Sequence, residues 1–419
     1  MQVEIITIGN EVLSGRTLDT NFAFLARALE EVSVPVVWHT TVGDVGERIG
    51  EALRRALTRA DGVVMTGGLG PTPDDITRKA VAAALGRRLQ LDDDVLARIR
   101  DRAKRSGRKL PASVESQALL PRGATAWPNP LGTAPGLLIT QDEKPVILLP
   151  GVPQEMEALA VEFVIPYFRE RSGLAVESFT LRTAGAFESQ LHERIGKLPQ
   201  RWPGAALAYL PSYFGVDLRV TVAGADPAPV HEVAMRAHEQ LEARVRPVIY
   251  AEGARTMEEV VGDLLVARGW RIAVAESCTG GLMARRLTDI DGSSRYFERG
   301  YVTYSNASKV ALLGVRPVDL DGHGAVSAPV AEQMARGARE QAGVEVGAGI
   351  TGVAGPTGGS DEKPVGTVFI AVAAPDGAAV RTYRFMGTRR AIRERAAQTA
   401  LDLVRRTLQG LPLDPALDG

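Results

Sequence analysis

A serine, a lysine and a tyrosine occur where they can act as nucleophile, base and proton relay. The apolar run Arg271–Ala275 predicts a strand, which leads into Glu276–Gly281 and places Ser277 in the first turn of a helix opened by glycines. Backbone N–H groups at a helix start are unpaired, so they can hold a developing oxyanion. About thirty residues further on, Tyr304 and Lys309 supply a phenol and an amine. A serine paired with a lysine is an alternative to the Ser-His-Asp triad.

This pair also has a structural interpretation, in which Ser277 caps the helix and Lys309 is a solvated surface lysine. As a base, Lys309 must be neutral, whereas an exposed lysine has a pKa of about 10.4, so burial or a nearby positive charge has to lower that pKa. Cys278 competes with Ser277 for the nucleophile role, because a thiol at a helix start can have a lowered pKa. A lone cysteine is more often a small buried hydrophobe.

The segment Gly347–Gly359 is too rich in glycine for the interior of a helix or strand. It is therefore predicted to be a loop whose backbone approaches another group closely. Three irregular segments, around Ser277, Lys309 and this loop, favour an active site over a core.

The segments Glu276–Gly281, Tyr304–Lys309 and Gly349–Gly359 resemble the signature segments of the C-terminal domain of the CinA family, the nicotinamide mononucleotide deamidases. The resemblance covers about residues 255 to 410. It implies hydrolysis of the carboxamide of nicotinamide mononucleotide to nicotinic acid mononucleotide and ammonia, without a cofactor.

The resemblance assigns the nucleophile to Ser277 and proton transfer to Lys309 with Tyr304 beside it. The N–H groups around Thr279 and Gly280 are candidates for the oxyanion hole. The predicted substrate-binding residues of this domain are Thr279, Gly280, Gly281, Asn306, Thr351, Gly352, Arg389 and Arg393.

Arg389 and Arg393 are four residues apart at the start of a predicted helix, so both can grip a phosphate. Arginines in a first helical turn otherwise point to solvent. Thr388 departs from the acidic residue that the family carries at that position.

The N-terminal third contains a second candidate site. The strand Met1–Gly9 is followed by Asn10, Glu11, Ser14 and Asp19. A second strand, Asp61–Met65, leads into the glycine-rich turn Thr66–Thr77 and a predicted helix from Arg78 to Leu85. Such a turn is a phosphate-binding shape.

Asp74 and Asp75 lie in this turn and can hold a divalent cation beside the phosphate. Either carboxylate can instead cap the following helix. With Leu149–Met156, the pattern resembles the molybdopterin-binding fold of the MogA and MoaB proteins, in the version found at the N-terminus of CinA, over about residues 1 to 168.

This second resemblance implies metal-dependent hydrolysis of ADP-ribose, with Mg²⁺, Mn²⁺ or Co²⁺ as cofactor. The alternative is a domain that binds a nucleotide or a molybdopterin-like ligand without turnover. The predicted ligand-binding residues are Asn10, Ser14, Gly67, Gly68, Gly70, Thr72 and Gly151. The candidate metal ligands are Asp74, Asp75, Asp19 and Glu11, with the assignment among them open.

Between the two sites, strand and helix patterns alternate as βαββα(β), with a strand at Ser178–Thr183, a helix around Glu188–Ile195 and two strands joined near Tyr213–Gly215. A helix over Pro229–Arg246 and a strand at Val248–Tyr250 complete this module, which in CinA is a KH-like linker. KH domains hold RNA through a Gly-x-x-Gly loop, and that spacing is absent from residues 171 to 250. The module is therefore expected to act as a spacer or to position a dimer.

The predicted fold is a multidomain α/β protein with a MogA/MoaB-like domain at 1–170, a small α+β KH-like domain at 171–252 and an α/β deamidase domain at 253–415. The net charge of −1 gives no excess of positive charge for binding nucleic acid, and the one cysteine fits a reducing cytoplasm. The five histidines lack ligand spacing, and no apolar run is long enough to span a bilayer. The expected partners are the small nucleotides and a second copy of the chain, with no nucleic acid and no membrane.

The run Arg98–Lys109 is basic, and it is interpreted as a solvated helix end and loop, with a place over the N-terminal pocket as the alternative. A last rival class makes the whole chain an interaction protein of the competence system. A scaffold, however, has no chemical reason to combine Ser277, Tyr304 and Lys309 with the glycine-rich segment.

Overall fold

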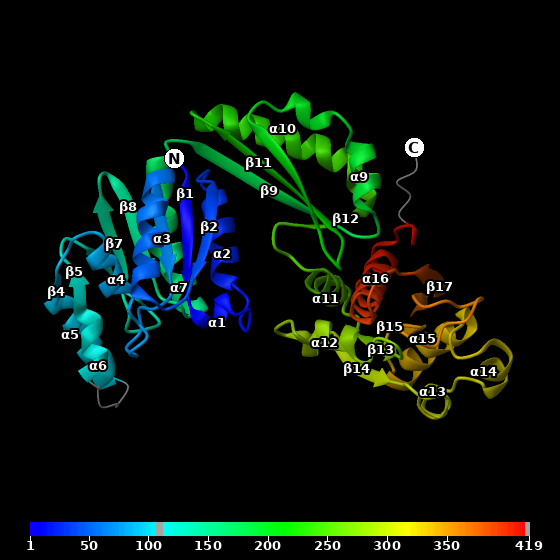
Figure 1. Ribbon diagram of the computed structural model, residues 1–419. Coiled ribbons are helices and arrows are strands. Elements are labelled where there is room, and N and C mark those ends of the chain that lie inside the picture. Colours follow the sequence, from blue (N-terminus) through cyan, green and yellow to red (C-terminus); the bar gives the residue numbers. More distant parts are fainter. Residues whose placement is uncertain (106–111, 415–419) are drawn as a thin grey trace. The chain divides into compact units, whose positions relative to one another are not determined.

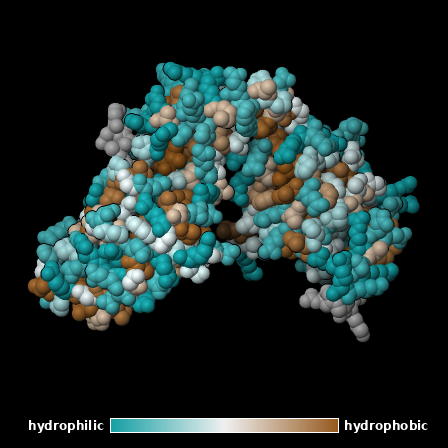
Figure 2. Space-filling model, turned by 180° about the vertical axis from the view of Figure 1, so that it is seen from behind, coloured by the Kyte–Doolittle hydropathy of each residue, from teal (hydrophilic) through white to brown (hydrophobic). Residues whose placement is uncertain are grey.

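The computed structural model describes residues 1–105 and 112–414, so the end of the basic run, from Ser106 to Lys109, lies outside the described residues. The chain divides into two compact units. The first contains residues 1–177 and 223–231, and the second contains residues 178–222 and the residues from 232 on. Hydrophilic residues cover most of the face seen in Figure 2. Across 1–105 and 112–414, no helix combines the length and the apolar character that crossing a bilayer requires.

The first unit is built on a six-stranded sheet with the order β2-β1-β3-β8-β7-β6 (Figure 1). Its parallel strands are β1 (Val3–Ile8), β2 (Val36–Val42), β3 (Gly62–Thr66) and β8 (Lys144–Leu149). Strand β7 (Gly136–Gln141) is antiparallel to β8, and β6 (Thr125–Trp127) is antiparallel to β7. A separate pair is formed by β4 (Leu89–Leu91) and β5 (Leu119–Pro121). The α-helices are α1 (Asn10–Leu13), α2 (Thr20–Glu30), α3 (Gly46–Arg59), α4 (Thr77–Ala84), α5 (Asp93–Arg105), α6 (Ala112–Glu115), α7 (Pro153–Leu159) and α8 (Ile165–Ser172).

Both faces of the sheet are buried at β1, β3 and β8, which explains why these parallel strands are mostly apolar, whereas β2 is partly exposed. Ile5 and Val64 belong to the core on the side of α2 and α7, whereas Ile6 and Met65 belong to the core on the side of α3 and α4. Because β1, β3 and β8 are parallel, their carboxyl ends meet at one edge of the sheet, where binding sites of such folds form.

The KH-like module forms a four-stranded sheet with the order β10-β11-β9-β12. Its elements are β9 (Ala175–Thr183), α9 (Glu188–Ile195), β10 (Ala205–Pro211), β11 (Val216–Gly224), α10 (Pro227–Val245) and β12 (Ile249–Glu252). The predicted order of strands and helices is confirmed, including both ends of α9.

The C-terminal module has a five-stranded sheet with the order β14-β13-β15-β16-β17. Strands β13 (Ile272–Glu276), β14 (Phe297–Val302) and β15 (Val346–Gly352) are parallel, and β16 (Thr367–Ala374) and β17 (Gly377–Arg384) are antiparallel. The α-helices are α11 (Met257–Arg268), α12 (Leu282–Thr288), α13 (Asn306–Leu313), α14 (Pro317–His323), α15 (Ala328–Ala342) and α16 (Arg389–Gln409). Ile272 and Val274 pack in the core that includes α11 and α16, while Ala273 and Ala275 face the core of α15.

The glycine-rich segment differs from the predicted loop in its first half, because Val346–Gly352 is the central strand β15. A Cβ on Gly347 would lie 2.1 Å from the carbonyl oxygen of Ala335, and one on Gly349 would lie 2.5 Å from that of Ala331. These glycines let the backbone of α15 lie directly against the strand. The close approach was predicted correctly, but its partner is a helix and only the part after Gly352 is a loop.

Candidate functional sites

The C-terminal candidate site lies where β13 and β14 end. Ser277 follows β13, and Lys309 lies in α13 after β14. Because these strands are parallel neighbours, their carboxyl ends bring the two side chains together. The Nζ atom of Lys309 is 3.3 Å from the Oγ atom of Ser277 and donates to the carbonyl oxygen of Thr303 at 2.7 Å.

Lys309 is only 1% exposed, so the interpretation of a solvated surface lysine is wrong. Burial lowers the pKa of its amine, because the charged form loses its hydration. This is the direction that a general base at neutral pH requires.

Cys278 is buried in the hydrophobic core between β13 and α16, as a small apolar residue would be. Burial raises the pKa of its thiol to about 12. The thiol is therefore protonated at neutral pH, and Ser277 is the better nucleophile of the two.

The turn that carries Ser277 differs from the prediction. Helix α12 begins at Leu282, so Ser277 precedes the helix and does not lie in its first turn. The buried carboxylate of Glu276 accepts hydrogen bonds from the N–H groups of Gly281, Met283 and Ala284, at 3.1, 3.1 and 2.8 Å. Sequence reasoning missed this role, which a carboxylate at the end of a buried strand could have signalled.

Another hydrogen bond of the serine turn removes one of the two predicted oxyanion donors. The N–H group of Gly280 donates to the carbonyl oxygen of Ser277 at 3.1 Å, so its assignment as an oxyanion donor is wrong. Within the described residues, the N–H group of Thr279 has no hydrogen-bond acceptor. Thr279 therefore remains as the backbone donor beside Ser277.

The hydroxyl of Tyr304 does not contact the Ser277–Lys309 pair. It accepts a hydrogen bond from Nη2 of Arg389 at 3.0 Å, and Lys309 reaches only the carbonyl oxygen of Tyr304, at 3.5 Å. The other terminal nitrogen of Arg389 donates to the carbonyl oxygen of Gly355 at 2.8 Å. The predicted relay is therefore replaced by a link between Tyr304, Arg389 and the glycine-rich loop.

The remaining predicted residues of this site have different surroundings. Arg393 donates to the carbonyl oxygen of Thr279 at 2.6 Å and so braces the serine turn from α16. Thr351 is 1% exposed and its hydroxyl donates to the carbonyl oxygen of Ala325, so it is not available for a substrate. Asn306 is exposed at the start of α13, and Gly352 ends β15 with no room for a side chain.

The N-terminal candidate site is a cavity of about 560 Å³ at the carboxyl ends of β1, β3 and β8. We call it the glycine-turn cavity. Of the predicted residues, those that line it are Gly67, Gly68, Gly70, Gly151, Glu11, Asp74 and Asp75. Asp44 and Glu155 also line it and were missed, because the sequence does not show which loops reach the sheet edge.

The glycine turn has a backbone that only glycine adopts easily. Gly67 and Gly68 have φ angles of +111° and +64°. A Cβ on Gly67 would lie 2.0 Å from the carbonyl oxygen of Ile8. The carboxylate of Asp75 accepts from both the N–H group and the hydroxyl of Thr72, at 2.8 and 2.6 Å, and α4 has no side-chain cap. The helix-cap interpretation of these aspartates is therefore wrong.

Asp19 does not line the glycine-turn cavity. It caps α2 by accepting from the N–H group of Phe22 at 2.8 Å, and its other oxygen lies 3.2 Å from Nε2 of His39. Asp19 therefore lies apart from the other three candidate metal ligands, which line the cavity.

Asn10, Ser14 and Thr72 do not line the cavity. The N–H group of Asn10 donates to Asp44, and Ser14 and Thr72 make hydrogen bonds within their own turns. No group of three or more histidine, cysteine, aspartate or glutamate side chains in residues 1–105 and 112–414 is arranged to hold a metal ion. A cation here would need ligands from the substrate.

Comparisons with known proteins match three successive segments of the chain. Residues 4–170 match the family model "Probable molybdopterin binding domain", 178–251 the "Damage-inducible protein CinA KH domain" and 254–408 the "CinA C-terminal domain". A CinA-like protein of Chlorobaculum tepidum is 44% identical over 411 residues, which cover 96% of this chain and 97% of the relative. The chain belongs to the CinA family.

A second CinA-like protein, from Geobacter sulfurreducens, is 43% identical over 97% of this chain and 99% of its own length. Among solved structures, the CinA protein of unknown function from Thermoplasma acidophilum is 42% identical over 39% of this chain and 95% of its own, with a TM-score of 0.37.

Proposed function

We propose that the C-terminal domain is a serine hydrolase that removes ammonia from the carboxamide of nicotinamide mononucleotide. The observation that carries the proposal is the 3.3 Å approach of the buried Lys309 amine to the Ser277 hydroxyl. A serine becomes a nucleophile when an adjacent base takes its proton, and a lysine with a lowered pKa can do so. The choice of substrate rests on the resemblance of the signature segments to the deamidase family.

In this mechanism, Oγ of Ser277 attacks the amide carbon while Nζ of Lys309 takes the hydroxyl proton. The resulting oxyanion lies near the N–H group of Thr279, which has no acceptor among the described residues. Lys309 then returns the proton to the departing nitrogen, ammonia leaves and an ester to Ser277 remains. Water hydrolyses that ester, with Lys309 taking the proton of the water and returning it to Ser277.

Arg389 is the proposed phosphate ligand of the substrate. Its guanidinium is held by Gly355 and Tyr304, two neutral oxygen acceptors, so its positive charge is not neutralised by a carboxylate there. A phosphate at this point would also face the N-terminus of the 21-residue helix α16. Arg393 has a supporting role, since it already holds the serine turn.

The test compares Ser277→Ala with Cys278→Ala in an assay of ammonia release from nicotinamide mononucleotide. Ser277→Ala should reduce turnover at least about a thousandfold, because it removes the nucleophile. Cys278→Ala should keep most of the activity, since the thiol is buried and protonated. An active serine variant together with a dead but folded cysteine variant would reverse the assignment.

For the N-terminal domain we propose metal-dependent hydrolysis of the diphosphate of ADP-ribose in the glycine-turn cavity. The donor set fits a magnesium-like ion that is held by one or two carboxylates and completed by phosphate oxygens. Glu11 and Asp75 would supply those carboxylates, with Asp74 as the third candidate in the same cavity, and the bound ion would neutralise diphosphate charge and lower the pKa of an attacking water. The N–H groups of the glycine turn would hold one of the two phosphates.

This second activity is tested with Glu11→Gln and Asp75→Asn, which keep the side-chain shapes and remove charge. Both variants should lose metal-dependent ADP-ribose hydrolysis and keep deamidation, whereas Ser277→Ala should do the reverse. Binding of ADP-ribose without turnover by the unmodified chain would support the alternative of a binding domain. Absence of both activities would favour the competence-associated interaction protein.

A further inference from the structure

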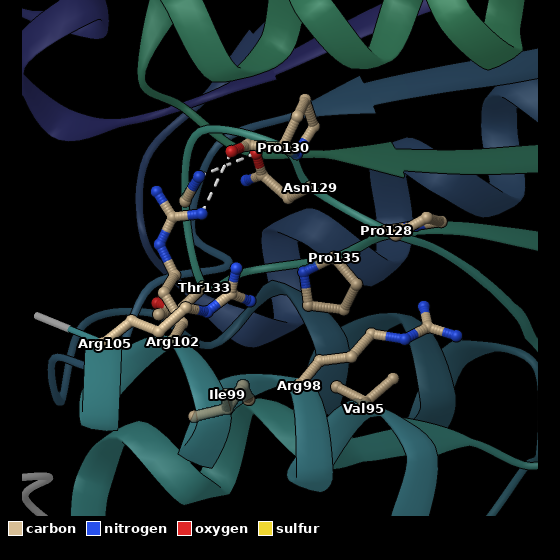
Figure 3. A pocket seen from close by; sticks show the side chains of 11 residues that line it. Val95, Arg98, Ile99, Arg102, Arg105, Pro128, Asn129, Pro130, Thr133 and Pro135 are labelled. Carbon is tan, nitrogen blue, oxygen red and sulfur yellow. Dashed lines mark hydrogen bonds between the residues drawn. The ribbon is translucent and has the colours of Figure 1, made fainter.

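A second pocket of the first unit, of about 530 Å³, lies between α5 and the loop 128–135. We call it the arginine pocket. Val95, Arg98, Ile99 and Arg102 line it with the spacing of one helix face, and Arg105 follows at the end of α5. Figure 3 shows the three arginine side chains on the side of α5 that faces this loop. The proposal above makes no use of this pocket.

The loop wall of the arginine pocket is held from both sides. From within, the amide of Asn129 accepts from the N–H groups of Leu131 and Gly132, at 2.9 and 2.8 Å. From α5, the guanidinium of Arg102 donates to the carbonyl oxygen of Pro130 at 3.0 Å (Figure 3) and also to that of Leu131. The wall is therefore built before any ligand binds, which reduces the entropic cost of binding.

The charge of the pocket is positive, since its lining contains three arginines and no carboxylate. Arg105 pairs with Asp101, and Arg102 is used by the loop. Arg98 is exposed, and its side chain has no hydrogen bond or ion pair within residues 1–105 and 112–414. The guanidinium of Arg98 can therefore donate hydrogen bonds to a ligand.

The arginine pocket adjoins the glycine-turn cavity. Gly132 and Thr133 line the first, and Thr133 also lines the second. Asn129 joins the two, because it lines the arginine pocket and donates to the carboxylate of Glu155 in the glycine-turn cavity at 2.7 Å. Five carboxylates and no basic residue line the glycine-turn cavity. A region of negative charge thus borders a region of positive charge across one loop.

We propose that the arginine pocket is an anion subsite, in which Arg98 binds one phosphate of a nucleotide diphosphate whose other phosphate lies across Thr133 in the glycine-turn cavity. The planar guanidinium matches two phosphate oxygens, and the adjacent proline and aliphatic walls suit the uncharged part of such a ligand. The second part of this proposal rests on the proposed nucleotide site. A small ligand is favoured over nucleic acid, because the chain has a net charge of −1 and the basic lining is confined to one pocket.

The first experiment measures binding of inorganic pyrophosphate to the full chain by calorimetry, in chelator and without divalent metal. Under these conditions the carboxylates of the glycine-turn cavity repel the anion, and the arginine pocket does not. Arg98→Ala should weaken binding about tenfold, the loss expected for one charge-assisted contact. Lys104→Ala is the matched control, since Lys104 is an exposed cation of α5 outside the pocket, and it should bind pyrophosphate like the unmodified chain.

The second experiment measures ADP-ribose binding with metal present, where Arg98→Ala should again weaken affinity about tenfold and Lys104→Ala should not. Failure of metal-free pyrophosphate binding, or equal weakening by both variants, would overturn the anion subsite. A loss of pyrophosphate binding with ADP-ribose affinity unchanged would overturn the shared ligand. Tighter binding of a single-stranded oligonucleotide than of pyrophosphate would point to nucleic acid and refute the small-ligand assignment. Absence of ADP-ribose hydrolysis alone would count against the proposed N-terminal activity and leave this binding result standing.

Discussion

Lys309 provides the sharpest test of the proposed mechanism, through the substitution Lys309→Met. Methionine nearly matches the length and volume of the buried side chain but cannot accept a proton. Loss of a positioned general base should lower kcat for deamidation about 10²- to 10⁴-fold. That range corresponds to an increase of about 3 to 5 kcal/mol in the activation free energy. Circular dichroism and thermal melting check that the variant is folded, since Lys309 also donates to the carbonyl oxygen of Thr303.

The pH dependence is the second part of this test. Because burial lowers the pKa of Lys309 below its ordinary value of 10.5, the neutral base should become available below that pH. The kcat/KM of the unmodified chain should therefore rise with pH through an ionisation below 10.5 and then level off, a step that Lys309→Met should lack. Lys309→Arg should be equally inactive, since a guanidinium stays charged. Substantial turnover by Lys309→Arg with an unchanged pH profile would make Lys309 a substrate-binding cation and refute the base assignment.

The lowered pKa of Lys309 also determines how the stability of the fold changes with pH. Between the folded pKa of Lys309 and 10.5 the unfolded chain binds more protons than the folded chain, so burial of this amine destabilises the fold most below that window and less as pH rises through it. The free energy of unfolding of the unmodified chain should therefore increase with pH there, relative to Lys309→Met. Denaturant titrations of both proteins at several pH values measure this difference, and parallel curves would contradict the lowered pKa.

Arg389→Ala should raise KM for nicotinamide mononucleotide about tenfold with a smaller change in kcat, because it removes a phosphate contact made in both the ground and transition states. A fall in kcat alone would exclude this role. Glu276→Gln should lower the free energy of unfolding by about 2 kcal/mol, since an amide accepts fewer of the three N–H groups, and denaturant titration measures it. Gly67→Ala should lower the free energy of unfolding by more than about 2 kcal/mol or abolish ADP-ribose binding. The reason is that Gly67 has a positive φ and that a Cβ there would clash with the carbonyl oxygen of Ile8. Unchanged stability and binding would show that the turn tolerates a side chain.

Local patterns predicted much of this fold. The alternation of strand and helix patterns located α9 at Glu188–Ile195, and the glycines before α4 located the N-terminal turn. These features depend on residues that are neighbours in the chain. The segment Val346–Gly352 was predicted less well, because its glycines look like a loop until α15 is known to press against them.

Contacts between distant residues account for the other differences. Tyr304 and Arg389 are separated by 85 positions, and no pattern around either residue shows that the two side chains meet. Asp19 was grouped with other carboxylates by its position after β1, yet its neighbour in space is His39 from β2. Composition can list the polar groups of a site, but the sheet order decides which of them share a cavity.

The carboxylate of Glu276 occupies the place at the start of α12 where strand–turn–helix sites commonly hold the phosphate of a ligand. The serine turn therefore carries its own internal anion and does not depend on substrate for its shape. In hydrogen exchange, the amides of Gly281, Met283 and Ala284 should be protected before any nucleotide is added. Substrate should add little protection there, so changes on binding would concentrate in the loop after Gly352, which Arg389 ties to the site.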